Sequence, residues 1–287
     1  MYPPLPGSHS SCWGASKLLI VLGVVLALPY FAFAQSWPLV VCADAANLPY
    51  SHRSGEGFEN RIATLIADEM GASVEFLWTD SPYARTQRLL LEQGDCDLLM
   101  AAADGQSGFE TSLAYYRSSY VFVQRADHPG QVRNFDDAVL RSLSIGVLLP
   151  DGRNVSPPTH ALVNRNLISN QIGFVADRVS GDGMRDVVDA VEAGTVDVAV
   201  VWGPVAGYFA ASAEADMHVR PVHPQVDAPF VPMVMSVSIA MRAGDVDLKD
   251  LVNTALVQRW DDVQTILDAY GVPTLELPRP SLQGREP

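Results

Sequence analysis

LEQGDCDLLM at residues 91–100 and VEAGTVDVAV at residues 191–200 are two versions of one pattern, one hundred positions apart. Each version runs from a helical pattern through a glycine and an aspartate into an apolar stretch. Glycine after a helix readily adopts the left-handed conformation that ends it, and a continuous apolar run suits a strand covered on both faces. The repeat therefore predicts two similar lobes. The alternative is one larger doubly wound α/β sheet, in which any helix that leads into a parallel strand gives this pattern.

Residues 1–34 have the features of an export signal. Lys17 precedes an apolar stretch that ends in Ala-Phe-Ala at Ala34, the small residues that signal peptidase prefers. We predict a signal peptide cleaved between Ala34 and Gln35, and therefore a soluble periplasmic product that does not span the membrane. An uncleaved membrane anchor is the alternative, because the apolar run is about as long as the minimum that crosses a bilayer.

The chain is strongly acidic. It has 19 Lys and Arg against 33 Asp and Glu, for a formal net charge of −14. Loss of the predicted leader, which carries only Lys17, makes the product one unit more negative. Such a surface repels phosphate backbones, so we expect no nucleic-acid partner. It keeps an exported protein soluble and could steer a basic partner.

Two cysteines, Cys42 and Cys96, remain after the predicted leader. An oxidising compartment permits a disulfide between them. However, Cys42 lies well along a predicted strand, whereas Cys96 opens one. If those strands are parallel neighbours, their stagger exceeds the Cα separation of about 7 Å that a disulfide tolerates. We therefore expect two buried free thiols, with a disulfide as the alternative.

Strand and helix patterns alternate along the rest of the chain. Apolar, β-branched runs indicate strands, and apolar residues three and four apart indicate helices. Strands are expected at residues 39–43, 74–78, 97–101, 120–123, 143–148, 196–201 and 233–241, and helices at 58–70, 83–93, 184–192 and 246–270. A long loop is expected through Pro157 and Pro158, and a loose, proline-rich tail after Gly271.

This order predicts an α/β protein of two lobes, each a mixed sheet flanked by helices. The chain crosses between the lobes near residues 117–119 and again near residues 231–235, and such a pair of crossings makes a natural hinge around a cleft. We assign residues 35–118 and 233–275 to lobe 1, residues 119–232 to lobe 2, and residues 276–287 to a flexible C-terminal tail.

Several strings resemble family 3 of the periplasmic solute-binding proteins, which serve amino-acid importers. They are YYRSSYVFV at 115–123, the strand and turn at 197–205, and VNTAL at 252–256. The resemblance covers about residues 37–275 and implies the type II periplasmic binding fold, with a two-crossing hinge.

Two departures from that family concern the ligand. Its amino-acid binders usually hold the ligand carboxylate with an Arg just after the third strand of lobe 1, because a guanidinium grips a carboxylate in bidentate fashion. Here residues 104–110 read DGQSGFE, without an Arg. The same binders hold the ligand ammonium with an Asp where this chain has Trp202. Both charged anchors are missing, so ordinary amino-acid transport is disfavoured.

Closer strings resemble the J-type accessory proteins of methanol dehydrogenase operons, the MoxJ family. These strings are VCAD at 41–44, NLPYS at 47–51, GEGFENRI at 55–62 and YYRSSY at 115–120. The resemblance implies a non-catalytic periplasmic protein needed for active pyrroloquinoline-quinone (PQQ) methanol dehydrogenase. It would assemble that enzyme or a related quinoprotein dehydrogenase, or deliver the cofactor. The alternative is an importer receptor that binds, in its cleft, a small ligand other than an ordinary amino acid.

The sequence lacks the usual patterns of catalysis and metal binding. The histidines are scattered through loops without metal-ligand spacing. No Gly-x-Ser-x-Gly elbow or phosphate-binding loop occurs. Gly55 and Gly57 lie too far past their strand to form a dinucleotide fingerprint. We expect no enzyme activity, no metal and no resident cofactor, and we rank a hydrolase that uses Cys42 or His160 last.

The cleft candidates come mainly from the loop at residues 44–60, which should face the carboxyl ends of the first strands. Several have a structural alternative. Glu56 and Glu59 suit the first turn of a helix, Phe58 suits the core beneath that helix, and Arg117 could pair with an acid of lobe 2. Trp202 and Tyr208 could equally pack inside lobe 2. The candidate ligand or partner residues are Asp44, Asn47, Tyr50, Ser51, Glu56, Phe58, Glu59, Asp104, Arg117, Ser119, Trp202 and Tyr208.

Overall fold

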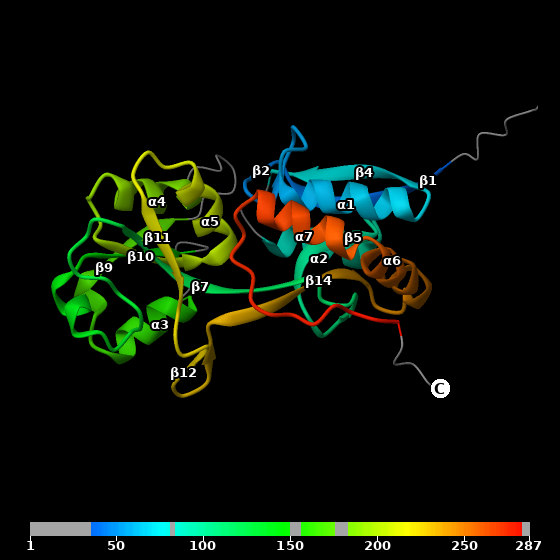
Figure 1. Cartoon of the computed structure of the whole chain (residues 1–287). Helices are drawn as coiled ribbons and strands as arrows, with labels where there is room; N and C mark the ends of the chain where they lie inside the picture. The colour runs from blue at the N-terminus through cyan, green and yellow to red at the C-terminus, as the bar shows by residue number, and fades with distance from the viewer. Residues whose placement is uncertain (1–35, 81–83, 150–155, 176–182, 283–287) are drawn as a thin grey trace, which may run out of the picture. The chain divides into compact units, whose positions relative to one another are not determined.

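Figure 1 shows the computed structural model of the chain, which describes residues 36–80, 84–149, 156–175 and 183–282. The predicted leader and its cleavage site at Ala34 and Gln35 lie outside these residues. Within them, no helix has both the length and the apolar composition that crossing a membrane requires.

Four main strands form the sheet of lobe 1, in the order β4–β1–β5–β14. Strand β1 (Trp37–Asp44) runs parallel to β4 (Ala72–Thr79) and to β5 (Leu98–Ala103). Strand β14 (Val234–Arg242) lies antiparallel to β5 and also pairs with the short β6 (Phe109–Thr111). The parallel part is the βαβαβ unit that the sequence predicts.

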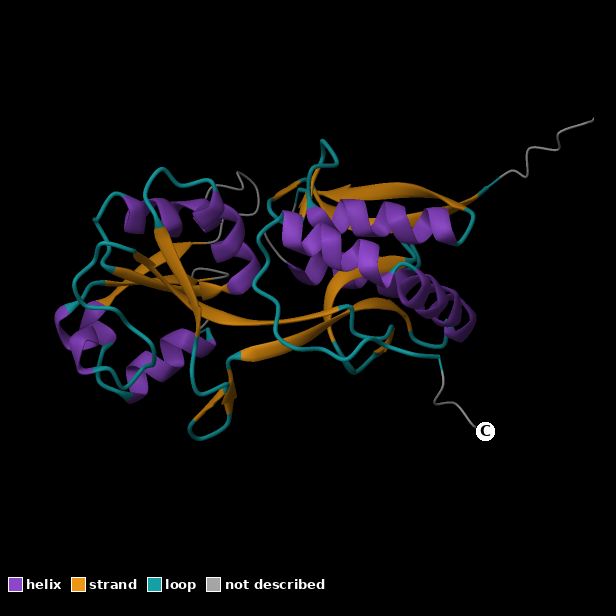
Figure 2. Ribbon diagram, in the orientation of Figure 1, coloured by secondary structure: helices purple, strands orange, loops and turns teal. Residues whose placement is uncertain are grey.

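Helices cover both faces of this sheet (Figure 2). Successive side chains of β1 point to opposite faces. Leu39 and Val41 share one hydrophobic cluster with α1 (Phe58–Glu69), α6 (Val246–Gln258) and α7 (Trp260–Ala269), whereas Cys42 faces α2 (Ala84–Gln93). Lobe 1 is therefore a three-layer α/β/α structure.

Lobe 2 has the same layering with its own cores. Its strands follow the order β7–β10–β8–β9, and β11 pairs with the second half of β7. Helix α3 packs on one face of these strands, and α4 and α5 pack on the other. The elements of this lobe are β7 (Tyr116–Arg125), β8 (Ile145–Leu149), α3 (Pro157–Asn164), β9 (Gln171–Val175), α4 (Gly183–Glu192), β10 (Val198–Trp202), α5 (Gly203–Ala211) and β11 (Met217–Pro221).

The remaining elements are short. Two 3₁₀ turns, η1 (Ala138–Ser142) and η2 (Ile168–Asn170), lie in lobe 2. Strands β2 (Ala46–Asn47) and β3 (Ser51–His52) form a small hairpin after β1, and β12 (Val226–Asp227) and β13 (Val231–Pro232) form a second hairpin before β14.

Paired strands connect the two lobes. Strand β7 pairs antiparallel with β14 from Tyr116 to Ser119, and further along with β10 from Tyr120 to Val123. The hydrogen-bonded path therefore continues through both lobes, while each lobe has its own buried clusters, which meet at half-buried residues such as Tyr50 and Tyr208. The two-lobed α/β fold is confirmed, and its hinge consists of strands rather than of loops.

The predicted helix at residues 246–270 is two helices, so this prediction is wrong in part. Helix α6 ends at Gln258 and α7 begins at Trp260, with Arg259 at φ −101° and ψ 20° between them. The turn lets Leu256 and Val263, both fully buried, face the same core around α1. Apolar spacing alone does not reveal such a change of direction.

The loop expected through Pro157 and Pro158 is instead the start of α3. Proline fits the first turn of a helix because its missing N–H would have no partner within the helix. The two prolines therefore mark a helix start, and the sequence prediction was wrong here.

The tail expected to be loose after Gly271 is bound to the hinge in its first part. Ser118 donates its hydroxyl to the carbonyl of Pro273 at 2.6 Å, and the Leu275 N–H donates to the carbonyl of Arg117 at 2.7 Å. Val272 is buried. The expectation is wrong for these residues, because the hydroxyl of Ser118 and the carbonyl of Arg117, both on β7, bind them. A flexible tail from residue 276 stays a prediction.

The expectation of free thiols is also wrong, because Cys42 and Cys96 form a disulfide with a Cα–Cα distance of 5.6 Å. The prediction treated Cys96 as the first residue of a strand parallel to β1. Strand β5 begins only at Leu98, and the chain turns at Gly94, where φ is +87°. Cys96 therefore lies outside the strand ladder, in the same buried cluster as Cys42.

Candidate functional site

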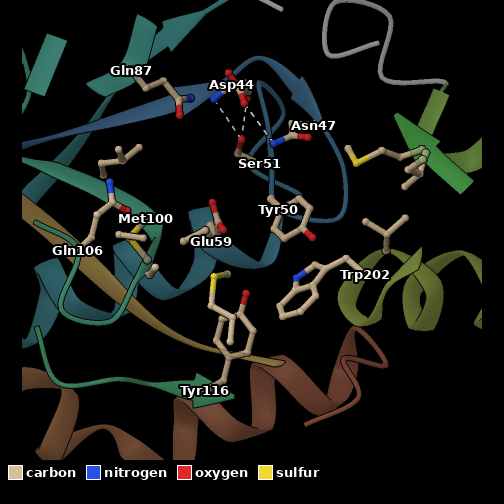
Figure 3. A pocket seen from close by; sticks show the side chains of 18 of the residues that line it. Asp44, Asn47, Tyr50, Ser51, Glu59, Gln87, Met100, Gln106, Tyr116 and Trp202 are labelled. Carbon is tan, nitrogen blue, oxygen red and sulfur yellow. Dashed lines mark hydrogen bonds between the residues drawn. The ribbon is translucent and has the colours of Figure 1, made fainter. Parts of the chain in front are cut away.

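A cleft with a volume of about 700 Å³ lies between the carboxyl ends of the lobe 1 strands and the facing elements of lobe 2 (Figure 3). Lobe 1 contributes the end of β1, strand β5 and the loop that leads to α1. Lobe 2 contributes the starts of α3, α4 and α5 together with β10. The large apolar side chains of the walls include aromatic rings and thioethers: Tyr50, Tyr116, Tyr120, Trp202, Met100, Met184 and Met235.

A polar network fixes the loop after β1. Ser51 donates its hydroxyl to the carbonyl of Asp44 at 2.9 Å and accepts the Asp44 N–H at 3.2 Å. The Asp44 carboxylate accepts hydrogen bonds from Asn47 Nδ2 at 3.1 Å and from Thr79 Oγ1 at 2.9 Å. These contacts hold Asp44, Asn47 and Ser51 together on the cleft wall, and Asp44 keeps only 4% of its surface exposed.

The same loop closes tightly over the start of α1. Asn60 Oδ1 accepts the N–H groups of Gly57 at 3.2 Å and of His52 at 2.9 Å. A Cβ atom at Gly57 would stand 2.1 Å from the carbonyl oxygen of Tyr50, so only glycine fits. This closure places Glu59, in the first turn of α1, on the floor of the cleft with 8% of its surface exposed (Figure 3).

The aromatic walls rest on further aromatic residues. The Tyr50 ring packs 5.4 Å from that of Phe58, and Trp202 packs edge-on against Tyr120 at 5.3 Å. Burial raises the pKa of Tyr120 to about 12. Burial, together with the neighbouring Tyr115, Tyr50 and Glu59, also raises the pKa of Tyr116 well above its usual value. The hydroxyls of Tyr116 and Tyr120 are therefore neutral at physiological pH.

Half of the candidate residues meet in the cleft: Asp44, Asn47, Tyr50, Ser51, Glu59 and Trp202. Phe58 does not line it, because its side chain is fully buried in the core of lobe 1 between α1 and Tyr116. Glu56 is exposed and accepts a hydrogen bond from Ser54. Asp104 is also exposed and accepts the hydroxyl of Ser238 at 3.2 Å.

The other three candidates belong to the hinge and to the packing between elements. Arg117 donates to the side chain of Gln225 at 3.2 Å, not to an acid of lobe 2. Ser119 is buried, and its carbonyl lies under Gly203. Tyr208 stacks on Tyr270 with 5.7 Å between ring centroids. None of the three lines the cleft, because each makes its contacts inside the fold.

Several lining residues are not among the sequence-based candidates, because the sequence around them indicates only a buried hydrophobic core. Tyr116 and Tyr120 belong to β7, and Met100 belongs to β5. Gln87 and Gln106 supply amides to the wall. Gln106 lies in the segment where the amino-acid binders carry their Arg, so that departure could have indicated it. Nothing in the sequence distinguished Gln87 from a solvent-facing helical residue.

The charges on the wall are unequal. Among the described lining residues, the acids are Asp44 and Glu59 and the cation is Arg88. Arg88 is exposed, and its guanidinium lies 5.1 Å from the centroid of the Phe109 ring. The two acids are therefore buried on the lobe 1 side of the cleft, and the cation stands at the rim.

The described residues hold no group of three or more His, Cys, Asp or Glu that could bind a metal ion. The sulfur of Cys42, on the cleft wall, is bound in the disulfide and is no nucleophile in this state. The exposed His160 lies 3.2 Å from the amide of Asn164. Neither residue of the least favoured hydrolase hypothesis therefore lies in a catalytic arrangement.

No family model matches the chain. The protein is 29% identical over 246 residues to Protein MoxJ of Methylorubrum extorquens AM1, an alignment that covers 83% of this chain and 81% of that protein. An alignment of this length extends into both lobes.

Two solved structures are similar along nearly the same part of the chain. The crystal structure of MxaJ from Methlophaga aminisulfidivorans MPT has a TM-score of 0.73 and 27% identity, and the match covers 83% of this chain and all of that one. The crystal structure of the periplasmic binding protein XoxJ from Methylobacterium extorquens AM1 has a TM-score of 0.68 and 29% identity, with the same coverage. These likenesses agree with the resemblance found in the sequence.

Proposed function

Since this chain is a MoxJ-like protein with the two-lobed fold of periplasmic binding proteins, we propose that it is a non-catalytic accessory protein in the periplasm. Its role is in the maturation of active PQQ-dependent methanol dehydrogenase. The partner is that enzyme or a related quinoprotein dehydrogenase.

The composition of the cleft wall carries this proposal. A receptor for an ordinary amino acid must hold a carboxylate and an ammonium together, which requires a buried cation and a buried anion at matching positions. Here Gln106 and Trp202 lie in the cleft near the places of those two anchors, and Arg88 stands at the exposed rim. The described lining residues include no buried cation, so the carboxylate of a free zwitterion would lack a charged partner there, whereas apolar side chains of a partner protein need none.

The alternative is a receptor of an importer for some other small solute. The hinge of paired strands and the 700 Å³ cleft favour it, since both are features of a solute-binding scaffold. A receptor should gain thermal stability from its solute, as ligand linkage requires. An accessory protein should instead form a complex with the dehydrogenase.

Gene deletion in a methanol-grown host tests the proposal most directly. Dehydrogenase protein, bound cofactor and activity are measured separately in the deletion strain. We expect the enzyme to be present but inactive, or depleted. Enzyme protein without PQQ assigns the role to cofactor loading, and loss of correctly assembled enzyme assigns it to assembly. Normal dehydrogenase activity together with lost uptake of a solute would overturn the proposal in favour of the receptor.

Complementation with point variants connects the function to the cleft. Trp202→Ala removes an aromatic wall, and Trp37→Ala, at the exposed start of β1, is the matched control. We expect the control to restore dehydrogenase activity and the cleft variant to restore it poorly, at equal protein levels. Equal rescue by both would move the functional surface away from the cleft.

A further inference from the structure

We propose that the hairpin of β12 and β13, residues 226–232, is a docking element whose Phe230 ring enters an apolar pocket on the surface of the partner dehydrogenase. The body that covers this tip is a folded protein, not a second copy of the chain and not a membrane. The inference deepens the proposed function by naming a surface that meets the partner, and it rests on that function for the partner's identity.

The first observation is the exposure of Phe230, in the turn between β12 and β13. Phe230 keeps 91% of its surface exposed, whereas Ile168, the next in order among the described large apolar residues, keeps 68%. Figure 1 shows the hairpin, labelled β12, projecting beyond the start of β14. A covered aromatic ring contributes a large apolar area. The Phe230 ring makes few contacts within its own chain and is available to another molecule.

The second observation is the backbone at Phe230, which gives no structural reason for a ring at this position. Its φ is +154°, in a range that bulky side chains rarely adopt and that glycine adopts readily. A residue suited to the turn alone would be glycine. Uncommon backbone conformations of this kind cluster at binding sites. The ring therefore serves a purpose other than folding.

The third observation is the anchoring of the hairpin. Arg165 donates to both carboxylate oxygens of Asp227, at 3.0 and 2.8 Å, and Asp227 keeps only 2% of its surface exposed. The side-chain amide of Asn164, at the end of α3, donates to the carbonyl of Ala228 at 3.3 Å. A tip that is already held in place loses little conformational freedom on binding, so its contacts contribute more to affinity.

The charge of the tip indicates that its pocket is apolar. Asp227 is the one charged residue in the sequence 226–232, and its bidentate ion pair with Arg165 lies within the chain. The other residues are valine, alanine, proline and phenylalanine, and Val226 keeps 52% of its surface exposed. A partner that covers this tip desolvates no unpaired charge of the hairpin.

The net charge and the position of the hairpin favour a different protein as the partner. With a formal net charge of −14, two copies of the chain repel each other, and an anionic lipid surface repels the chain as well. Pro232, at the end of β13, lines the cleft, whereas Phe230 does not. A solute inside the cleft therefore leaves the ring uncovered, but a protein is large enough to enter the cleft and cover the tip together.

Photo-crosslinking in the methanol-grown host tests what covers the tip. The amino acid p-benzoylphenylalanine replaces Phe230 in the full-length chain, and in a control it replaces Leu251, which is 50% exposed on α6 of lobe 1. We expect irradiation to join position 230, and not position 251, to a dehydrogenase subunit identified by mass spectrometry. A product of two copies of this chain, an adduct with another protein alone, or no adduct at position 230 would overturn the inference.

Binding of the purified protein measures the contribution of the ring. The probe is immobilised dehydrogenase from the same host, with and without its cofactor. Phe230→Ala should bind at least about tenfold more weakly than the wild type, mainly through faster dissociation, because a few aromatic anchors dominate most interfaces. Phe230→Leu, which keeps an apolar side chain, should lose less, and Leu251→Ala is the matched control and should bind like the wild type. Equal binding by Phe230→Ala and the wild type, or no binding by the wild type to either form, contradicts the docking role.

Two further measurements separate docking from a role in the fold and from membrane binding. Phe230→Ala should leave the thermal unfolding midpoint unchanged, since a substitution at so exposed a side chain removes little packing. A lower midpoint together with weaker binding would assign the ring to the fold and overturn the inference. The wild type should not float with vesicles of phosphatidylethanolamine and phosphatidylglycerol, and flotation that depends on Phe230 would assign the tip to a membrane instead.

The docking element and the proposed function can fail separately. If deletion impairs the dehydrogenase and position 230 gives no dehydrogenase adduct, the proposed function stands and the docking element is wrong. If deletion leaves the dehydrogenase normal and position 230 is still joined to it, the docking surface stands and the proposed function is wrong.

Discussion

The two αβ corners have the same local structure but are held to their lobes by different interactions. They are residues 91–100 of lobe 1 and residues 191–200 of lobe 2. In each, a glycine with positive φ ends the helix, Gly94 at +87° and Gly194 at +69°. In each, the aspartate three positions later accepts a backbone N–H from the neighbouring strand segment: Asp97 from Val40 at 2.9 Å, and Asp197 from Ser144 at 2.7 Å. The repeated motif is therefore a structural joint.

The interaction that holds each corner in place differs at the residue before the aspartate. Cys96 is bonded to Cys42, whereas the equivalent Val196 packs in a buried cluster with α4 and α5. Among described residues, the α2 face of lobe 1 buries only Cys42, Leu91, Cys96, Ala102 and Ala240 in its cluster, and the corresponding lobe 2 cluster has twelve members. Half-buried residues, among them Leu99 and Phe109, complete the lobe 1 layer, but a layer with fewer fully buried side chains removes less apolar area from water. The disulfide supplies in lobe 1 the cohesion that apolar packing supplies in lobe 2.

Removal of the disulfide should have the largest effect. Cys42→Ala with Cys96→Ala should lower the free energy of unfolding by about 4 kcal/mol, the value that loop-closure entropy gives for this sequence separation. Val196→Ala, the control in lobe 2, should cost about 1–2 kcal/mol through lost burial. Urea unfolding measures both. Native-state hydrogen exchange should show faster opening of β1 and β5 in the cysteine variant. A smaller cost for the cysteine pair than for Val196→Ala would refute the idea that the bond replaces packing.

Removal of the two corner carboxylates should have the second-largest effect on stability, and Asp197 should cost more than Asp97. Asp197 accepts both the N–H and the hydroxyl of Ser144, each at 2.7 Å, whereas Asp97 accepts the Val40 N–H and lies 3.8 Å from Arg242. Asp197→Ala should cost about 2 kcal/mol and Asp97→Ala about 1 kcal/mol, since each lost hydrogen bond to a charged acceptor in a partly exposed site contributes about 1 kcal/mol. Thermal unfolding at neutral pH checks the order, and equal costs would show that the Ser144 hydroxyl adds nothing.

The corner glycines should matter less. Alanine at a positive φ costs about 1 kcal/mol. Gly94→Ala should cost more than Gly194→Ala, because a Cβ at Gly94 would lie 3.0 Å from Arg242 Nη1, against 3.5 Å from Arg125 Nη1 at Gly194. Gly94→Asn is the control, since asparagine tolerates this conformation better than alanine. Unfolding midpoints of the variants measure these costs. A lower midpoint for Gly94→Asn than for Gly94→Ala would contradict this explanation.

The corners also show what sequence reasoning could reach. The glycine, the aspartate and the apolar run predict a helix end and a strand, and β5 and β10 begin at Leu98 and Val198, within two residues of the predicted starts. The disulfide was missed because strand stagger was applied to Cys96, which precedes its strand. Local pattern determines element type well, but the path of a turn between elements depends on packing that the pattern does not contain.

The cleft residues, like the two corners, could be predicted only in part from the sequence. Candidates from the loop after β1 line the cleft, because the carboxyl ends of parallel strands bring such a loop to the binding edge. Tyr116 and Tyr120 were not proposed, since in a strand they are indistinguishable from core until the partner lobe is in place. Phe58 and Tyr208 were proposed and pack inside the fold instead. Which aromatic residue faces the cleft is decided by tertiary packing.

The smallest effect is a pH dependence at the lobe 2 corner. Burial raises the pKa of Asp197, but the hydrogen bonds from Ser144 and the nearby His128 outweigh it, and the net pKa lies below the usual 3.8. A carboxyl whose pKa is lower in the folded state stabilises the fold above its unfolded pKa, and this contribution is lost as the pH falls through the folded value. The stability difference between the wild type and Asp197→Asn should therefore shrink, relative to its value at pH 5, as the pH falls below about pH 4. Urea unfolding across this range measures the difference, with Asp97→Asn as the comparison from lobe 1. A difference that grows toward low pH would reverse the sign of the argument and would remove the Asp197 carboxylate from the forces that hold this corner.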